Sequence, residues 1–101
     1  MRNNLKIWHP ELSNISDKAI IGDDCVIHSN VWIGEGVIIG DRVKIQAFVF
    51  IPSGVSIESD VFIGPGVIFT NDKRPPSHGL DWAKTTVERG SSIGANATIL
   101  P

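Results

Sequence analysis

The sequence predicts an all-β solenoid in which short parallel strands stack around a narrow apolar core. The first observation is a series of large apolar residues, nearly all isoleucine, at every sixth position: Ile15, Ile21, Ile27, Ile33, Ile39, Ile45, Ile51, Ile57, Ile63 and Phe69. The second is a series of smaller apolar residues, each two positions before a member of the first: Ala19, Cys25, Val31, Val37, Val43, Val49, Val55, Val61 and Val67. A helix would place apolar residues three and four apart, so a period of six does not fit one. The β-branched residues that dominate both series favour strands.

The third observation concerns the residues between these strands. The position three after each large apolar residue often holds Gly, Asn or Asp, as at Asp24, Asn30, Gly36, Gly54, Asp60 and Gly66. These residues tolerate the positive φ that a sharp corner needs. A single coil cannot bury its apolar face alone, so neighbouring coils must stack to make the core. We expect the coils to rise by about 4.8 Å, the ordinary spacing between strands.

The chain divides into four segments of one domain that covers residues 1–101. Residues 1–14 precede the repeat, and Ile7-Trp8-His9 followed by Pro10 predicts a short strand and a turn that cap the first coil. Residues 15–70 form the coils, and 71–85 form an extruded loop whose two prolines cannot pair in a central ladder. Residues 86–101 resume the coil and leave it incomplete.

Composition and charge exclude several classes of function. Nine Lys and Arg face eleven Asp and Glu, so no basic surface for nucleic acid is expected. The one cysteine, Cys25, cannot form an intrachain disulfide and fits a reducing compartment. The N-terminus has no long apolar stretch, and no apolar run approaches the roughly 20 residues of a membrane helix. We therefore expect a cytoplasmic protein with no membrane partner.

The six-residue repeat over residues 15–70 and 87–101 resembles the hexapeptide-repeat acyltransferases. The resemblance implies a left-handed parallel β-helix with one extruded loop and with three hexapeptides in each coil. Residues eighteen apart would then stack, and one interior column would contain Ile15, Ile33, Ile51, Phe69 and Val87. Relatives of this kind continue for several more hexapeptides. We therefore expect this chain to be C-terminally truncated and to correspond to the N-terminal part of a longer protein.

The position before each large apolar residue should point outward. On one face this position holds Trp32, Phe50 and Ile68. On the second face it holds Ile20, Ile38 and Ser56, and on the third it holds Val26, Lys44 and Phe62. Large apolar residues stacked on the outside of a solenoid indicate an interface. We expect a homotrimer that assembles through Trp32, Phe50 and Ile68, which agrees with the trimers that the resemblance implies, whose active sites lie between subunits.

Within this superfamily, residues 67–75, 85–90 and 93–99 resemble the nucleotide-amino-sugar N-acetyltransferases. The resemblance implies transfer of an acetyl group from acetyl-CoA to an amine of a UDP- or dTDP-linked amino-deoxysugar, in the biosynthesis of lipopolysaccharide or another surface polysaccharide. A ternary complex would make the attack of the amine effectively intramolecular. No strong general base is required if the amine arrives unprotonated and the thiolate takes the proton.

The candidate site residues follow from this resemblance and from their place beside the interruption of the repeat. Asn71 is the predicted catalytic residue, which would orient the amine. Asp72 would hold the loop or the sugar, Lys73 and Arg74 would bind a phosphate or a sugar carboxylate, and His9 would bind the substrate or make a structural hydrogen bond. For the acetyl-CoA arm, the small residues Gly94, Ala95 and Asn96 would allow close approach to the backbone. His28 and His78 are expected to be surface residues.

Three other classes of function could use such a repeat. A γ-type carbonic anhydrase needs three zinc-binding histidines, but His9, His28 and His78 lack paired spacing on adjacent strands. No metal is therefore expected. An O-acetyltransferase acting on a sugar or serine would need a catalytic histidine in a matching repeat. A truncated, non-enzymatic module that only oligomerises remains open as an alternative.

Overall fold

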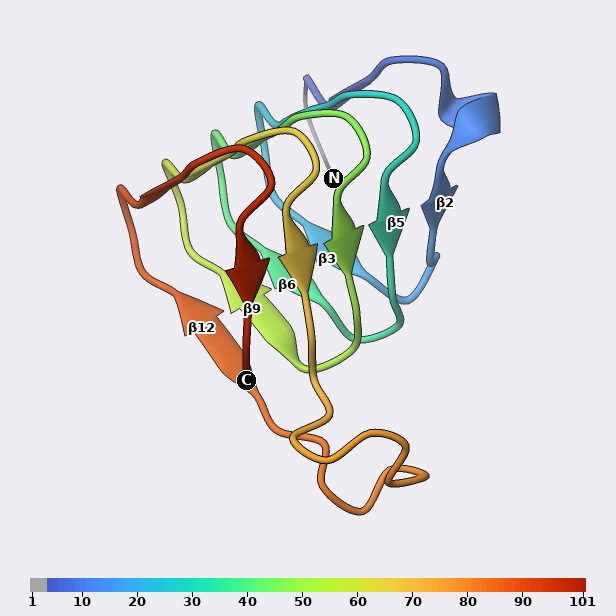
Figure 1. The fold of residues 1–101 in the computed structure, drawn as a ribbon. Coiled ribbons are helices and arrows are strands. Elements are labelled where there is room, and N and C mark those ends of the chain that lie inside the picture. The colour runs from blue at the N-terminus through green and yellow to red at the C-terminus, as the bar shows by residue number, and fades with distance from the viewer. Residues whose placement is uncertain (1–3) are drawn as a thin grey trace.

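The computed structural model describes residues 4–101, in which short parallel strands wind into a three-sided coil (Figure 1). Sheet A holds β1 (Lys6–Ile7), β4 (Val26–Ile27), β7 (Lys44–Ile45), β10 (Phe62–Ile63) and β13 (Ser92–Ile93), in that order. Sheet B holds β2 (Asn14–Ile15), β5 (Trp32–Ile33), β8 (Phe50–Ile51), β11 (Ile68–Phe69) and β14 (Thr98–Ile99). Sheet C holds β3 (Ile20–Ile21), β6 (Ile38–Ile39), β9 (Val55–Ile57) and β12 (Thr85–Val87). The chain visits A, B and C in turn, so the three sheets are the three faces of one solenoid.

The core consists of the two apolar series that the sequence predicted. Every member of the isoleucine series from Ile21 to Phe69 is buried, and so is every member of the smaller series from Ala19 to Val67. Among the described residues, no polar or charged side chain is buried. Full burial of one such apolar side chain contributes about 1.5–3 kcal/mol. Removal of these side chains from water is therefore the main stabilising contribution in the fold.

A regular ladder of backbone hydrogen bonds joins each coil to the next. Through the middle of the chain, an N–H donates to a carbonyl of the following coil, as from Ile20 to Val37 (2.9 Å) and from Trp32 to Val49 (2.9 Å). In sheet C, Ile39 pairs with Ile57, which lies three hexapeptides further along the chain, whereas Ile57 pairs with Val87, which lies five hexapeptides further along. The extruded loop thus lengthens one coil by two whole hexapeptides.

The added length places the returning strand on a different face from the predicted one. Val87 pairs with Ile57 in sheet C, and Phe69 is followed in sheet B by Ile99. The predicted column from Ile15 to Phe69 is confirmed, but the assignment of Val87 to this column is wrong. The six-residue period records only whether a residue points inward, and this is the same on all three faces.

The corners adopt the left-handed backbone that the sequence predicted. All six predicted corner residues have positive φ, between 60° and 95°: Asp24, Asn30, Gly36, Gly54, Asp60 and Gly66. Two further corners hold residues poorly suited to this conformation, Arg42 (φ 56°) and Phe48 (φ 63°). For a residue with a Cβ the left-handed region costs roughly 1–2 kcal/mol.

Arg42 makes contacts that offset this cost. Its Nε donates to Asp60 Oδ1 (2.7 Å) and its Nη2 donates to Asp60 Oδ2 (3.2 Å), one coil further on. The hydrogen bond from Arg42 lowers the pKa of Asp60, and the nearby Arg89 guanidinium (3.2 Å) acts in the same direction. Paired, geometrically matched charges thus join three successive corners between sheets C and A.

The N-terminal segment forms the first coil and does not merely precede it. Strand β1 pairs with β4 in sheet A, and the short 3₁₀ helix η1 (Pro10–Leu12) turns the chain into β2. The Lys6 Nζ lies 4.1 Å from the centre of the Trp8 ring, which stacks on His28 at a centroid distance of 6.4 Å. Of the predicted capping segment 1–14, residues 1–3 lie outside the part that the structure describes.

Within residues 4–101 there is no helix of the length and apolar character that a membrane crossing requires.

Truncation of a core isoleucine tests how strongly the stacked columns stabilise the coil. Ile51 is fully buried at the centre of sheet B, so Ile51→Ala should lower the free energy of unfolding by about 2–5 kcal/mol in urea titrations. The matched control is Ser56→Ala on the outer face of sheet C, which should change it by less than about 0.5 kcal/mol. Equal losses in the two variants would contradict a core built from the inward series.

Candidate functional site

The extruded loop leaves the coil at the corner that follows β11 and returns at the start of β12. It projects away from the stack of coils, in orange at the bottom of Figure 1. Its neck is closed by the Ala83 N–H, which donates to the Asn71 carbonyl (2.7 Å), and by an antiparallel bridge between Asp72 and Trp82. The Lys73 N–H donates to the Asp81 carbonyl (3.2 Å). The loop is therefore an ordered excursion with a hydrogen-bonded base.

Asn71 stands where the loop departs, and its side chain continues the corner of the coil. Its Nδ2 donates to the carbonyl of Ser53 (2.9 Å), which lies 18 residues earlier, and the Ser53 Oγ donates in turn to the Glu35 carbonyl (2.8 Å). These bonds hold the Asn71 amide in one orientation. Its Oδ1 makes no hydrogen bond to another described residue, so this oxygen is available as an acceptor.

Asp72 organises the loop. Its Oδ1 accepts from the Arg74 N–H (3.1 Å) and its Oδ2 from the Ser77 N–H (2.9 Å). Partial desolvation raises the pKa of this carboxyl, but the hydrogen bonds from Ser77, Arg74 and the Trp82 side chain together lower it below its usual value. Two roles were expected for Asp72, holding the loop or holding the sugar. Its observed hydrogen bonds hold the loop.

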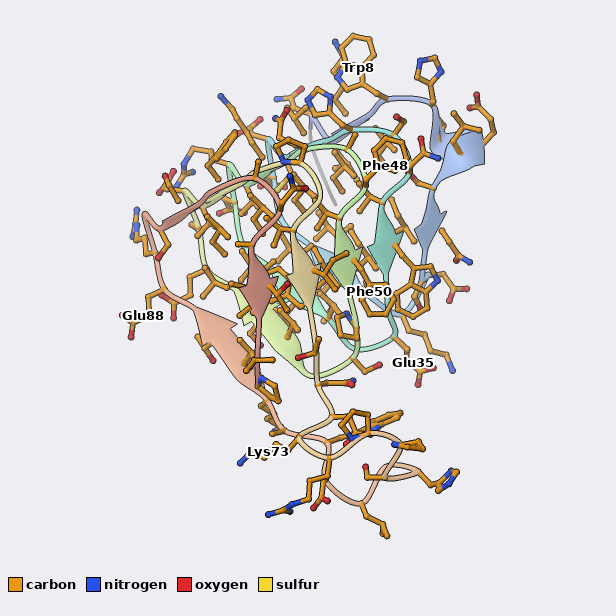
Figure 2. All side chains as sticks on the ribbon, in the orientation of Figure 1. Trp8, Glu35, Phe48, Phe50, Lys73 and Glu88 are labelled. Atoms are coloured by element: carbon orange, nitrogen blue, oxygen red, sulfur yellow. The ribbon has the colours of Figure 1, made fainter. Side chains whose placement is uncertain are left out.

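Lys73 and Arg74, the two adjacent cations that follow Asp72, face different partners. The Arg74 Nη1 lies 3.4 Å from the Asp81 carboxylate, which it pairs with across the loop. Lys73 has no ion pair with another described residue, and its side chain is exposed and lines a cavity at the base of the loop. Figure 2 shows Lys73 beside the neck of the loop. Of this adjacent pair, Lys73 is thus the cation without an ion-pair partner among the described residues.

The cavity has a volume of about 410 Å³ and combines apolar walls with a few polar groups. Its apolar lining comes from sheet B, the loop and the last coil: Phe50, Ile68, Phe69, Pro75 and Leu100. Its polar lining is the run that the sequence singled out: Thr70, Asn71, Asp72 and Lys73. An apolar cleft with a small number of converging polar groups is the usual form of a small-molecule site.

The predicted cofactor residues lie at the opposite edge of sheet B. Gly94, Ala95 and Asn96 form the corner between β13 and β14, and the Asn96 N–H donates to the Pro65 carbonyl (2.9 Å) of the coil before it. A Cβ added to Gly64, one coil before Gly94, would collide with the backbone of Ile93, Gly94 and Ala95, so successive coils approach closely at this corner. Because six extended residues span about 20 Å, one chain does not bring this corner to Asn71.

The three histidines lie apart from the cavity. His9 is in the first coil, in the left-handed conformation, with its Nδ1 3.6 Å from the Glu11 carboxylate. His28 stacks on Trp8 at a corner of the next coil, and His78 lies in the extruded loop with a φ of 57°. No three His, Cys, Asp or Glu side chains gather around a common point in the described part of the chain. His9 is therefore not beside Asn71 within one chain.

Sequence reasoning missed that Phe50 and Ile68 belong to the wall of the cavity as well as to the outward stripe. Their outward direction was predicted, but the contribution of Leu100 depends on the two added hexapeptides, which bring β14 beside β11. Phe48 was also missed. Its signal was present in the sequence, because an aromatic residue stands at a corner position that elsewhere holds Gly, Asn or Asp.

Comparison with known families identifies the repeat. Residues 36–71 match the bacterial transferase hexapeptide (six repeats), and residues 18–53 match the hexapeptide repeat of succinyl-transferase. No curated protein matches the sequence. The structure is similar to that of WeeI from Acinetobacter baumannii AYE, with a TM-score of 0.70, 14% sequence identity, and coverage of 98% of this chain and 47% of that one. The chain thus spans about half the length of that protein.

The three-sided coil and the matched repeats together define a left-handed parallel β-helix, as the sequence predicted. The two family matches cover residues 18–71, slightly more than half of the chain. The chain belongs to the hexapeptide-repeat transferase family.

Acid titration of the loop tests the role of Asp72. Its pKa is lowered in the folded protein, so its contribution to loop order is present above the ordinary carboxyl pKa and is lost as the pH falls through the lowered value. The fluorescence of Trp82, obtained by difference from a Trp82→Phe protein, should show this transition. Asp72→Asn should remove it, and the Asp81→Asn control should retain it. A transition unchanged in Asp72→Asn would show that another group holds the loop.

Proposed function

We propose that the protein is an acetyl-CoA-dependent N-acetyltransferase that acts on a UDP- or dTDP-linked amino-deoxysugar in the cytoplasm, for surface polysaccharide biosynthesis. The observation that carries the proposal is the Asn71 amide. It is fixed by its bond to Ser53, it lines an apolar cavity, and its Oδ1 has no partner among the described residues. Membership of a transferase family supports group transfer as the reaction class.

The acceptor sugar would occupy the cavity at the base of the loop. The Asn71 Oδ1 would accept a hydrogen bond from the amine and so direct the nitrogen lone pair toward the acetyl group. Lys73 would meet a phosphate or carboxylate of the substrate. The apolar walls formed by Phe50, Ile68 and Leu100 suit the methyl group and ring face of a deoxysugar.

The reaction itself needs little acid–base chemistry from the protein. The neutral amine attacks the thioester carbonyl carbon, an N–C bond forms, and the C–S bond of acetyl-CoA breaks. The amine loses one proton and the departing thiolate takes it up, which gives the N-acetyl sugar and CoA thiol. Holding both substrates in one complex makes the step effectively unimolecular, and this can supply most of the rate enhancement.

The donor would bind along the corner formed by Gly94, Ala95 and Asn96, whose small side chains would allow close approach to the backbone. This corner and Asn71 lie at opposite edges of sheet B, so a complete site requires a second copy of the chain. A homotrimer supplies that copy if the corner of one subunit approaches the cavity of the next.

The outward stripe of sheet B supports such an assembly. Trp32, Phe50 and Ile68 pair in register and are 40%, 37% and 38% exposed. The Trp32 and Phe50 rings stack with centroids 4.9 Å apart. A continuous apolar surface of this kind usually marks a protein–protein contact, and Phe50 and Ile68 continue it into the cavity wall.

Release of free thiol tests the proposed function directly. The protein is incubated with acetyl-CoA and either a UDP- or a dTDP-linked amino sugar, and the thiol is followed with a chromogenic disulfide while mass spectrometry detects the acetylated sugar. Asn71→Ala should lower kcat by at least about 100-fold, a loss typical of a group that positions a reacting proton.

The matched control is Asn4→Ala, which removes an exposed amide that bonds to Asp24 in the first coil, outside sheet B and outside the lining of the cavity. It should keep full activity. Absence of turnover with both classes of sugar would refute the enzymatic proposal for this chain and favour the oligomerising module. Unchanged turnover in Asn71→Ala would refute the role of this residue alone.

A charge placed in the stripe tests the assembly. Trp32→Glu or Phe50→Glu should yield monomers or aggregates in light scattering, since a carboxylate buried at an apolar contact is unpaired. Phe62→Glu is the control, because Phe62 is 39% exposed on sheet A, outside the stripe. A native trimer that survives both stripe variants would show that the subunits meet elsewhere.

A further inference from the structure

Phe48 occupies a corner at which the other coils carry small or amide side chains. The corner column between sheets A and B contains Asn30, Phe48, Gly66 and Asn96, all with positive φ. Consecutive corners are joined by backbone hydrogen bonds, from the Gly66 N–H to the Ala47 carbonyl (3.0 Å) and from the Asn96 N–H to the Pro65 carbonyl (2.9 Å). The column is therefore a straight edge of the solenoid on which Phe48 is the one bulky residue.

No ring stack or cation–π contact within the described part of the chain offsets the conformational cost of a phenylalanine at this position. Arg42, the comparable exception at another corner, is held by its two hydrogen bonds to Asp60. The Phe48 ring is 64% exposed and takes part in none of the ring stacks or cation–π contacts of the described residues. A residue kept in a strained conformation without local compensation points to a function for its side chain. Figure 2 shows the ring on the outside of the coil, away from the extruded loop.

The next two corners bring a polar group close to Phe48 on the same edge. Gly66 has no side chain, and a Cβ added to it would collide with Asn96 Oδ1. The Asn96 side-chain amide thus lies against Gly66, one coil from Phe48, and it makes no hydrogen bond to another described residue. An exposed aromatic ring and an unpaired amide therefore lie on the same edge, and the amide covers the glycine corner next to the ring.

We propose that Phe48 and Asn96 bind a nucleobase, which stacks on the Phe48 ring and presents an edge to the Asn96 amide that lies over Gly66. Stacking of a base on an exposed aromatic side chain is favourable for every base, and an amide matches the adjacent donor and acceptor of a base edge. The identity of the ligand rests on the proposed function, because acetyl-CoA and the nucleotide sugar each carry a nucleobase joined to phosphates. The two sources share this chemistry and are separated by the experiment.

Calorimetric titrations of the whole chain with acetyl-CoA, S-acetylpantetheine, UDP and dTDP test the proposal. Phe48→Asn should raise the Tm by about 4–8 °C, because it relieves the left-handed strain in a domain of this size. The same variant should weaken binding of the nucleobase ligand roughly ten-fold. Phe48→Tyr, which keeps the ring, should bind normally, and Asn96→Gly, which keeps the corner, should weaken the same ligand.

The arms of the titration identify the source of the base. Weaker binding of acetyl-CoA with unchanged binding of S-acetylpantetheine assigns the adenine of the donor, and weaker binding of UDP or dTDP assigns the base of the sugar nucleotide. The proposal is overturned if wild type binds none of the nucleotides, if Phe48→Asn binds all of them as wild type does, or if Phe48→Asn loses subunits in light scattering. Nucleotide binding that depends on Phe48, in a protein that releases no thiol, would retain this inference and reject only the proposed reaction.

Discussion

The hydrogen-bond ladder between successive coils is the constraint on which the rest of the structure depends. Because each N–H in the ladder reaches a carbonyl of the next coil, the coils must stay in register with one another, and the part of each coil that lies in the ladder must have the same perimeter. Polar backbone left unpaired in so narrow a solenoid would be costly. An insertion is therefore possible only at a corner, where the ladder is already interrupted. The extruded loop obeys this limit: it begins and ends at one corner and adds two whole hexapeptides.

The sequence indicates which residues point into the coil and which point out of it, but it does not indicate on which of the three faces a strand lies. Ile21 to Phe69 could be placed inside because their six-residue period is unbroken, and Trp32, Phe50 and Ile68 could be placed outside because each precedes an inward residue. Val87 could not be placed correctly, since its apolar character fits all three faces equally. The face on which Val87 lies depends on how many residues of the loop stand outside the coil, and no local sequence pattern indicates that number.

The candidate site was predictable to a similar degree. Asn71 could be found because it follows closely on the last unbroken apolar step, and its bond to Ser53 follows from the stacking of residues 18 apart in sequence. The difference between Lys73 and Arg74 was not predictable. It depends on Asp81 folding back across the loop, a contact set by the turn that Asp72 and Ser77 make.

Under the proposed function, the groups that meet the substrates lie at corners of the coil, whereas the outward positions of the strands hold mostly apolar residues. Most polar corner side chains are used by the scaffold itself: Asp41 accepts from the Asp23 N–H (2.8 Å), Ser59 from the Asp41 N–H (2.9 Å), and Glu58 from the Arg89 N–H (2.9 Å). These side chains bind the neighbouring coil and have a structural role. Asn71 uses only its Nδ2 in this way, and so it can be held in place and still offer an acceptor to a ligand.

The geometry also limits how a reaction with two substrates can proceed on such a scaffold. One face of the coil separates Asn71 from Gly94, Ala95 and Asn96, and short strands cannot bend to bring those corners together. If the donor binds at one corner and the acceptor at the other, the acetyl group reaches the amine only when the corner of a second copy lies beside the first copy's cavity. Such a copy would have to pack on sheet B, whose outward residues Phe50 and Ile68 are also walls of the cavity. Under the proposed function, the apolar stripe would therefore set the distance between the substrates as well as the affinity between subunits.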